Sequence, residues 1–239
     1  MADKIAFRNR AHEVSRLEAF SDVIFGFAVS LLVVSLEVPK DYHEMVELLR
    51  GFVPFAICFA LFIDIWFEHH HFFRRYAIFD RPTMMLNTAL LFVILFYVYP
   101  LKYMFTILVG GLRGEDPHIP PGGLRLLFTV YGIGFAAVFF VLAAMYSRAW
   151  KQRDELELNE VERIDTKESI YDNLFMGCFG LLSILLANVG LVRYAGPVYF
   201  LIAIPKTLVP WMMGMRRRKA AANITATAAA STATSTSPT

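Results

Sequence analysis

The stretch RLEAFSDVIFGFAVSLLVVSLEVP, residues 16–39, joins an apolar run to charged residues near both of its ends. Residues 23–38 are almost entirely apolar, whereas Arg16 and Asp22 precede them and Glu37 lies close to their end. An ionisable residue in or beside a membrane segment is costly, so it usually has a partner, a water-filled path or a function. The stretch therefore predicts a membrane helix whose charged ends contribute to the function.

The remainder of the chain predicts an all-α integral membrane protein. Of its 239 residues 56% are hydrophobic, and these gather in long continuous runs. A helix of about 20 apolar residues crosses a hydrocarbon core, and continuous runs indicate helices because barrel strands would alternate. Six runs reach this length, at 18–38, 48–68, 84–107, 123–147, 169–191 and 195–214.

The positions of Lys and Arg predict the orientation of the helices, because these residues are in excess in cytoplasmic segments. With the N-terminus in the cytoplasm, most of the 23 basic residues fall on the cytoplasmic side, so both termini are expected there. We divide the chain into a cytoplasmic N-terminal segment (1–17), a transmembrane domain (18–214) and a cytoplasmic tail (215–239). The tail is basic at first and then low in complexity, which is typical of disorder.

Four residues of the first apolar run share one helical face. Phe27, Ser30, Leu31 and Val34 follow the spacing i, i+3, i+4, i+7, which places a single hydroxyl among bulky apolar side chains. Such a stripe fits packing inside a helical bundle. It also fits a pore surrounded by several copies of the helix, in which acidic rings concentrate cations and an apolar constriction gates by dewetting. The pattern alone leaves both interpretations open, as it leaves open a helix-capping role for Ser21 and Asp22.

Neither the histidine run nor any other motif predicts an enzyme. His69, His70 and His71 follow Glu68, but adjacent side chains on a helix diverge by about 100°, whereas a zinc helix favours the spacing i, i+4. We therefore predict no metal site and no catalytic residue, and interpret the histidines as hydrogen-bonding or pH-sensing groups. The chain has no glycine-rich phosphate loop, no nucleophile elbow and no paired-cysteine motif.

Two sequence motifs, at residues 16–22 and 66–73, resemble those of a known family. The sequence RLEAFSD (16–22) has the pattern Arg-x-x-x-Phe-Ser-Asp, and WFEHHHFF (66–73) has the pattern Trp-x-x-His-His-x-x-Phe. An acid at Asp80, the pair Leu86-Asn87 and Pro100 follow. Together they resemble the transmembrane protein 175 potassium channels, of which this chain is similar in length to the single-repeat bacterial members. The resemblance implies a homotetramer in the plasma (inner) membrane, with the first helices lining a central pore.

The resemblance also implies roles for individual residues. The apolar rings of the pore fall at Phe27, Leu31 and Val34, and the hydroxyl layer falls at Ser30. Here Phe27 stands where Ile or Leu is usual and Ser30 where Thr is usual, so the preference for K⁺ over Na⁺ stays open. A network at the cytoplasmic end of the pore helix is implied for the following residues: Arg16, Phe20, Ser21, Asp22, Trp66, His69, His70 and Asn87.

The sequence thus predicts a potassium-permeable cation channel that conducts passively and needs no cofactor. K⁺ is the expected permeant ion, with Na⁺ or H⁺ as further candidates. The expected partners are other copies of the chain, the lipid bilayer and monovalent cations, but no nucleic acid. The alternatives are a proton-coupled secondary transporter, a proton-permeable channel and a membrane enzyme that uses the histidine cluster. A transporter would need a charged site near the membrane midplane, whereas here the charges cluster at the ends of the first helix. Asp64 in the second span fits either a proton path or pairing with a neighbouring helix near the interface.

Overall fold

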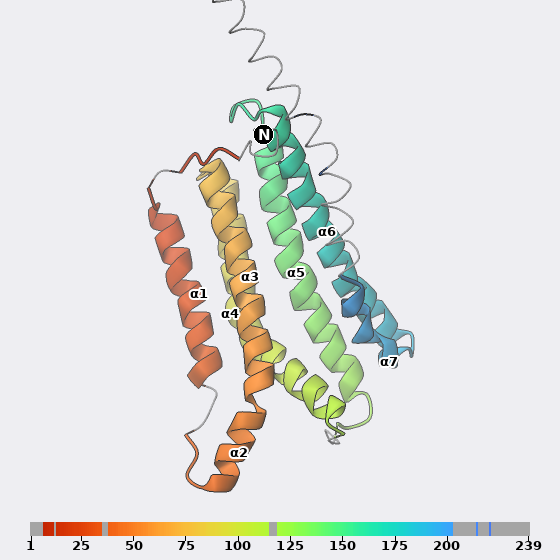
Figure 1. Ribbon diagram of the computed structural model, residues 1–239. Helices are drawn as coiled ribbons and strands as arrows, with labels where there is room; N and C mark the ends of the chain where they lie inside the picture. Colours follow the sequence, from red (N-terminus) through yellow and green to blue (C-terminus); the bar gives the residue numbers. More distant parts are fainter. Residues whose placement is uncertain are drawn as a thin grey trace, which may run out of the picture.

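A computed structural model describes residues 7–11, 13–34, 38–114, 119–202, 214 and 220. The described chain is a helical bundle (Figure 1). Its elements are α1 (Arg16–Val34), α2 (Tyr42–Arg50), α3 (Phe52–Tyr76), α4 (Arg81–Leu112), α5 (Gly123–Lys151), α6 (Glu160–Asn188), α7 (Val192–Ala195) and the 3₁₀ helix η2 (Pro197–Ile202). Within the described part, 5 helical segments are long and apolar enough to cross a membrane. These are α1, the continuous α2–α3 segment, α4, α5 and α6.

The first five predicted spans coincide with long helices, whereas most of the sixth lies outside the described residues. Of the span expected at 195–214, the described part to residue 202 is the end of α7 followed by a 3₁₀ helix. Residues 203–213 lie outside the described residues, as do 35–37 and all of the tail (215–239) except residue 220. The charged segment 148–168 mostly extends the neighbouring helices, since α5 runs to Lys151 and α6 begins at Glu160.

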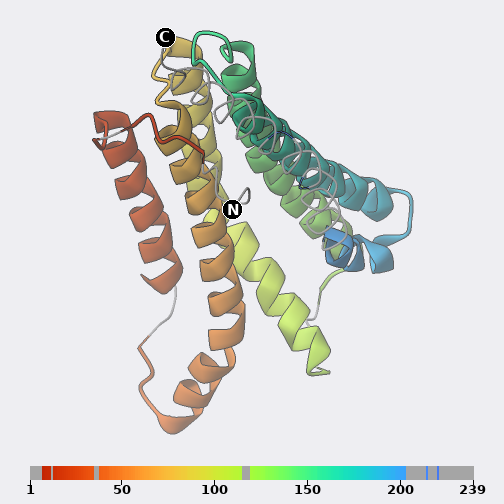
Figure 2. The same ribbon diagram turned by 45° about the horizontal axis from the view of Figure 1, so that its top comes forward.

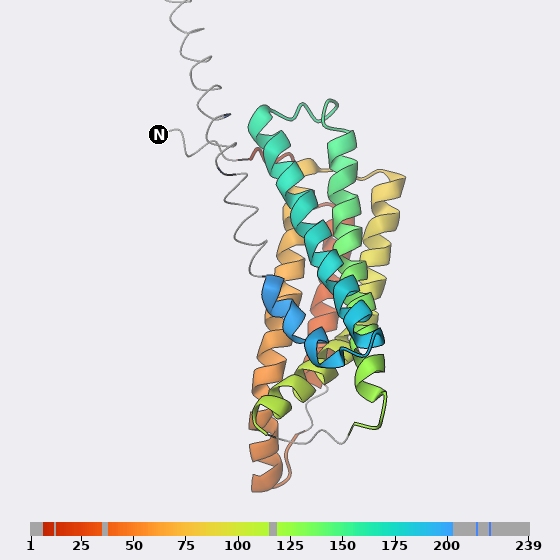
Figure 3. The ribbon, with the colours of Figure 1, turned by 90° about the vertical axis from the view of Figure 1, so that its right-hand side faces the viewer.

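The bundle has one closely packed helix pair and one helix at its edge. The most extensive packing in the bundle is between α5 and α6, which run side by side (Figure 3). Their backbones approach closely at two glycines, because a Cβ built on Gly180 would lie 2.8 Å from the carbonyl oxygen of Gly132. By contrast, α1 lies at the edge and packs on α3 and α4 (Figure 1). α4 contains Pro100, and its second half turns away from the bundle axis (Figure 2).

The start of α1 is capped by Ser15 and Glu18. The Ser15 hydroxyl accepts a hydrogen bond from the Glu18 backbone N–H (3.1 Å), and the Glu18 carboxylate accepts one from the Ser15 N–H (2.9 Å). This reciprocal pair is a capping box, which satisfies two N–H groups at the helix start. Ser21 and Asp22 therefore lie beyond the first turn and do not cap the helix, which removes one interpretation that the sequence left open.

Asp80 caps α4 and joins it to α5. Its Oδ1 accepts a hydrogen bond from the Thr83 N–H (3.0 Å), while Oδ2 accepts from the Arg148 guanidinium and from Gln152 Nε2 (3.1 Å). Burial alone would raise the pKa of this carboxyl, but the hydrogen bonds from Thr83 and Arg148 outweigh it and lower the pKa. Because the ionised form is favoured in the folded state, Asp80 stabilises the fold at neutral pH.

This lowered pKa predicts how stability depends on pH. The contribution of Asp80 is full above the unfolded-state pKa of about 3.9 and is lost as the pH falls through the lower folded-state pKa. Asp80→Asn is therefore expected to be less stable than the unchanged protein at pH 7, and the difference is expected to shrink below about pH 4. Thermal unfolding in detergent across this range measures it, with exposed Glu155→Gln as control. A difference that stays constant with pH would contradict the assignment.

Candidate functional site

α1 has one face fixed to the bundle and an opposite face that is open. Ser21, Phe25, Ala28 and Leu32 are buried against the neighbouring helices. On the opposite side Phe27 is 55% exposed, Val34 is 75% exposed, and Ser30 is exposed as well. Three members of the predicted stripe therefore point away from the subunit's own core.

Leu31, the fourth member of the stripe, occupies a different position. It is half-buried and packs against the hydrophobic core of the subunit. The reason is its angular position, because it lies about 60° around the helix from Ala28, which is fully buried. Leu31 consequently stands at the edge of the open face.

The hydroxyl of Ser30 is oriented by the helix itself. Its O–H donates a hydrogen bond to the carbonyl oxygen of Gly26 at 2.9 Å. A hydroxyl whose proton is used in this way keeps lone pairs free to accept from another group. Ser30 therefore offers the open face an oxygen acceptor between the side chains of Phe27 and Val34.

A buried hydrogen-bond chain connects α1, α4 and α3. Asn87 Nδ2 donates to Ser21 Oγ (3.0 Å), and Ser21 donates in turn to the carbonyl oxygen of Leu17 (2.8 Å). Asn87 Oδ1 lies 2.7 Å from His69 Nε2, and since this amide oxygen can only accept, Nε2 is assigned the proton. Ser21, His69 and Asn87 are at most 1% exposed. This chain fixes the buried face of α1.

A second contact joins α1 to α3 at the border of the buried chain. Trp66 Nε1 donates a hydrogen bond to Asp22 Oδ1 at 2.8 Å. The His70 ring stacks on Trp66, with ring centroids 5.4 Å apart and an interplanar angle of 24°. Asp22 itself is exposed and lines a groove between α1 and α3.

Two predicted members, Arg16 and Phe20, lie outside this network. Both are exposed, and Arg16 makes no hydrogen bond or ion pair with any residue that the structure describes. The helical geometry explains this difference, because Phe20 is about 100° and Arg16 about 140° around the helix from Ser21. The buried part of the network consequently consists of Ser21, His69 and Asn87, and it includes neither Arg16 nor Asp22.

Loss of the central amide is expected to destabilise the protein. Asn87→Leu would leave the Ser21 hydroxyl and the His69 N–H without their buried partner, at a cost of roughly 1–3 kcal/mol. Thr88→Leu on the exposed side of α4 is the control, since within the described part of the chain Thr88 bonds only to the Met84 carbonyl of its own helix. Thermal unfolding in detergent measures both variants. Equal stability of the two would show that the hydrogen-bond chain does not hold α1.

The three consecutive histidines point in different directions. His69 faces Asn87, His70 stacks on Trp66, and His71 stacks on Phe67 with centroids 6.2 Å apart. Their ring nitrogens therefore do not converge on one point, as a shared metal ion would require.

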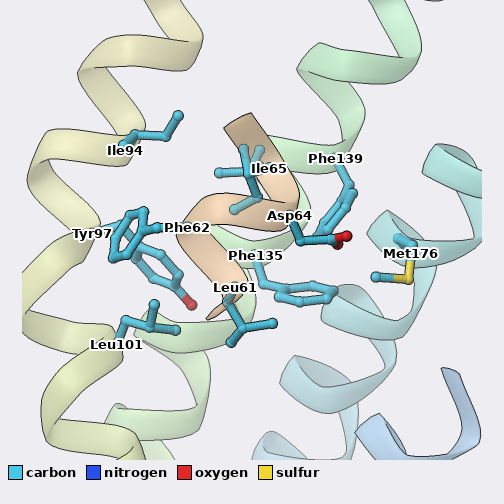
Figure 4. Close-up of a pocket in the computed structure, with 11 residues that line it drawn as sticks. Leu61, Phe62, Asp64, Ile65, Ile94, Tyr97, Leu101, Phe135, Phe139 and Met176 are labelled. Carbon is cyan, nitrogen blue, oxygen red and sulfur yellow. The ribbon is translucent and has the colours of Figure 1, made fainter. Parts of the chain in front are cut away.

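Asp64 lines a small cavity between α3, α4, α5 and α6 (Figure 4). The cavity has a volume of about 40 Å³, and its other lining residues are apolar or aromatic, including Tyr97, Phe135 and Met176. Such a volume holds a few water molecules, whereas ligand pockets usually exceed about 300 Å³. Asp64 thus borders a space suited to water more than to an organic substrate.

Comparison with known proteins identifies the class of protein to which this bundle belongs. Residues 16–97 match the family described as "Endosomal/lysosomal potassium channel TMEM175". The chain is 40% identical over 214 residues to a potassium channel of Marivirga tractuosa, covering 82% of this chain and 85% of that protein. It is 27% identical over 187 residues to a potassium channel of Chamaesiphon minutus, covering 71% and 84%.

Solved structures agree with these sequence matches. The crystal structure of a variant of the potassium channel MtTMEM175, in complex with a nanobody–MBP fusion, has a TM-score of 0.77 at 36% identity and covers 88% of this chain and 98% of that one. A TMEM175 homologue from Chamaesiphon minutus shares the fold, with a TM-score of 0.58 at 23% identity and coverage of 87% and 99%. These relatives are ion channels and not enzymes. The chain belongs to the TMEM175 potassium channel family.

Proposed function

We propose that four copies of this chain form a potassium-permeable channel with α1 of each copy lining a central pore. The observation that carries the proposal is the division of α1 into two faces. Its buried face is attached to α3 and α4 by Asn87 and Trp66, while Phe27, Ser30 and Val34 point out of the subunit. A helix held in this way presents the same face inward from every copy around an axis.

The surface beside this open face supports contact with another copy. A groove of about 390 Å³ runs between α1 and α3, lined by apolar residues such as Val29, Phe59 and Ile63 and by the carboxylate-bearing Asp22. Lipid tails would be a poor neighbour for a carboxylate, because an ionised group in hydrocarbon is costly. A neighbouring subunit, together with pore water near Asp22, provides a more suitable environment.

Conduction through this pore would be controlled by side chains instead of a backbone filter. Rings of Phe27 and Val34 would form narrow apolar constrictions that gate by dewetting, with Leu31 at their edge. Between these two rings, the Ser30 hydroxyl oxygens would coordinate cations and replace part of the hydration shell of each ion. The Asp22 carboxylates would raise the local concentration of cations at the entrance. Permeation would be passive, with K⁺ as the main ion.

The basic residues suggest the orientation in the membrane. Arg74, Arg75, Arg81, Arg148 and Lys151 lie at the end of the bundle where α1 begins (top of Figure 1). By the positive-inside rule we assign this end to the cytoplasm and the protein to the plasma (inner) membrane. Six spans over residues 18–214, a cytoplasmic segment 1–17 and a cytoplasmic tail 215–239 complete the proposed topology.

Asp64 supports one alternative function. A carboxylate beside a cavity within the membrane is a feature of proton-coupled transporters and of proton-permeable channels. Its cavity of about 40 Å³ would admit water and protons but is small for a substrate. We therefore rank this alternative below the potassium channel.

Ion flux from liposomes that contain the purified protein tests the proposed function. A K⁺ gradient is expected to drive passive K⁺ efflux that needs no pH gradient and moves no protons in a fixed ratio. Protein-free liposomes are the control, and chemical cross-linking is expected to trap a tetramer. Efflux that requires an opposing proton gradient, and that is lost in Asp64→Asn, would favour the transporter instead.

A further inference from the structure

A short arm of the chain crosses the end of the bundle before α1 begins. Residues 7–11 reach from the start of α1 past α3 to the junction of α5 and α6 (Figures 1 and 2). The backbone N–H groups of Arg10 and Ala11 donate to the carbonyl oxygen of Arg74, at 3.0 and 3.3 Å. The Phe7 ring packs edge-on against Tyr76, with centroids 5.4 Å apart. The arm is therefore docked on α3.

The arm meets α6 at a buried carboxylate. Glu162 is fully buried and accepts hydrogen bonds from the Arg8 N–H and Nε (both 3.0 Å), from Arg8 Nη2 (2.9 Å) and from Arg10 Nη2 (2.9 Å). It also accepts from the N–H of Asn159 at 3.1 Å. Arg10 also donates to the carbonyl oxygens of Leu156 and Arg75, and Arg8 to that of Glu157. Charge-assisted bonds from two guanidiniums to one buried carboxylate are the strongest of these contacts, so removing the carboxylate charge weakens the attachment of the arm to α6.

This anchor is coupled to α1 because the connection is short and α1 has no direct contact with α5 or α6. Among the described elements, α1 packs only on α3 and α4. The five residue steps from Ala11 to Arg16 can span at most about 17 Å when fully extended. Movement of the start of α1 away from α6 is consequently limited by this segment as long as the arm stays bound to Arg74 and Glu162.

We infer that Glu162 is a positioning residue for the pore helix, an inference that rests on the proposed function. By binding Arg8 and Arg10, Glu162 keeps the arm on α6, and the arm holds the start of α1 toward the core of its own subunit. The open stripe with Phe27 and Val34 faces the opposite way, toward the proposed pore axis. A short segment such as residues 11–16 resists extension but not compression. It therefore holds the cytoplasmic end of α1 away from the pore axis and keeps that end of the pore wide.

Neutralising the anchor tests this inference. Glu162→Gln is expected to lower K⁺ efflux per reconstituted tetramer by about three- to tenfold, because mutations within such coupled elements change an equilibrium by about that much. The K⁺/Na⁺ ratio is expected to stay unchanged, since the constriction itself is intact. Glu160→Gln is the matched control, because this exposed residue lies in the same first turn of α6 and changes charge equally. Unchanged or increased efflux in Glu162→Gln overturns the inference.

Lengthening the segment between the arm and α1 distinguishes a restraint on α1 from a local loss of stability around Glu162. Insertion of Gly-Ser-Gly-Ser between Glu13 and Val14 keeps every contact of Glu162 but slackens the segment, so it is expected to lower efflux as Glu162→Gln does. Combining the two changes is expected to lower efflux no further, whereas additive losses would indicate unrelated structural damage. The insertion also provides the test if Glu162→Gln fails to fold. Full efflux in the insertion variant overturns the inference.

The same series separates this inference from the proposed function. One outcome is that the unchanged protein conducts, with an efflux that Phe27→Ala alters and that Glu162→Gln and the insertion leave unchanged. In that case the proposed pore is retained and the role of the arm is rejected. If the unchanged, tetrameric protein does not conduct K⁺ at all, the proposed function is rejected and this inference with it.

Discussion

Replacing Phe27 by Ala is expected to raise passive K⁺ efflux per tetramer about tenfold and to lower the preference for K⁺ over Na⁺. Phe27 is the largest of the three exposed stripe residues Phe27, Ser30 and Val34, and it lies one turn from Ser30. Its removal would widen the apolar constriction, so water and hydrated cations of both kinds would enter more easily. Flux assays in liposomes under K⁺ and Na⁺ gradients measure the two quantities.

The control for this prediction is Phe92→Ala on α4. Phe92 is also a large exposed aromatic residue, at 71% exposure, but it lies on a helix that is not proposed to line the pore. Its loss is expected to leave efflux and ion preference unchanged. Equal effects of the two substitutions, or no effect of Phe27→Ala in a correctly assembled protein, would place the constriction elsewhere.

Gly180→Ala is expected to destabilise the folded subunit by roughly 1–3 kcal/mol, a typical cost of overpacking. The added Cβ would lie 2.8 Å from the carbonyl oxygen of Gly132 and 2.9 Å from the backbone nitrogen of Ala136. Both neighbours are backbone atoms, so neither can move aside without separating α5 from α6. Small residues at such crossings are what allow membrane helices to approach closely.

Gly111→Ala provides a control with the opposite expected sign. Gly111 lies in the last turn of α4 and has nothing within 4 Å of an added Cβ. Because Ala favours a helix over Gly by about 1 kcal/mol, this variant is expected to be as stable as the unchanged protein or more so. Thermal unfolding in detergent compares the pair. A Gly180→Ala protein that is as stable as Gly111→Ala would contradict the close packing of α5 and α6.

Hydropathy and motifs were enough to predict most of the bundle. The runs around Val23, Phe62, Ile94, Val138 and Ile184 each lie in a long helix, because continuous apolar segments have few alternatives in a membrane. The resemblance to the family also implied that Ser21 and Asp22 meet the segment that contains Trp66 and His69. This is possible because the ends of antiparallel helices joined in sequence return to the same side of the bundle.

Three features could not be predicted from local patterns. Glu162 is 154 residues from Arg8, and a mixed-charge segment gives no indication of which acid becomes buried. Leu31 shares the spacing of the stripe, but only the packing of α1 shows that it turns toward the core. The close approach of Gly132 and Gly180 depends on the register between two helices, which hydropathy does not specify. Each depends on contacts between distant parts of the chain.

The central claim is that the open face of α1 lines the ion path, and cysteine accessibility tests it most directly. In a background of Cys58→Ala and Cys178→Ala, Ser30→Cys would place one thiol on this face. Addition of Ag⁺, which reacts with thiols reached through water, is expected to block K⁺ efflux in Ser30→Cys. It is expected to have no effect on Phe96→Cys, an exposed position of α4. Persistent efflux from Ag⁺-treated Ser30→Cys, with block in Phe96→Cys, would contradict a pore lined by α1.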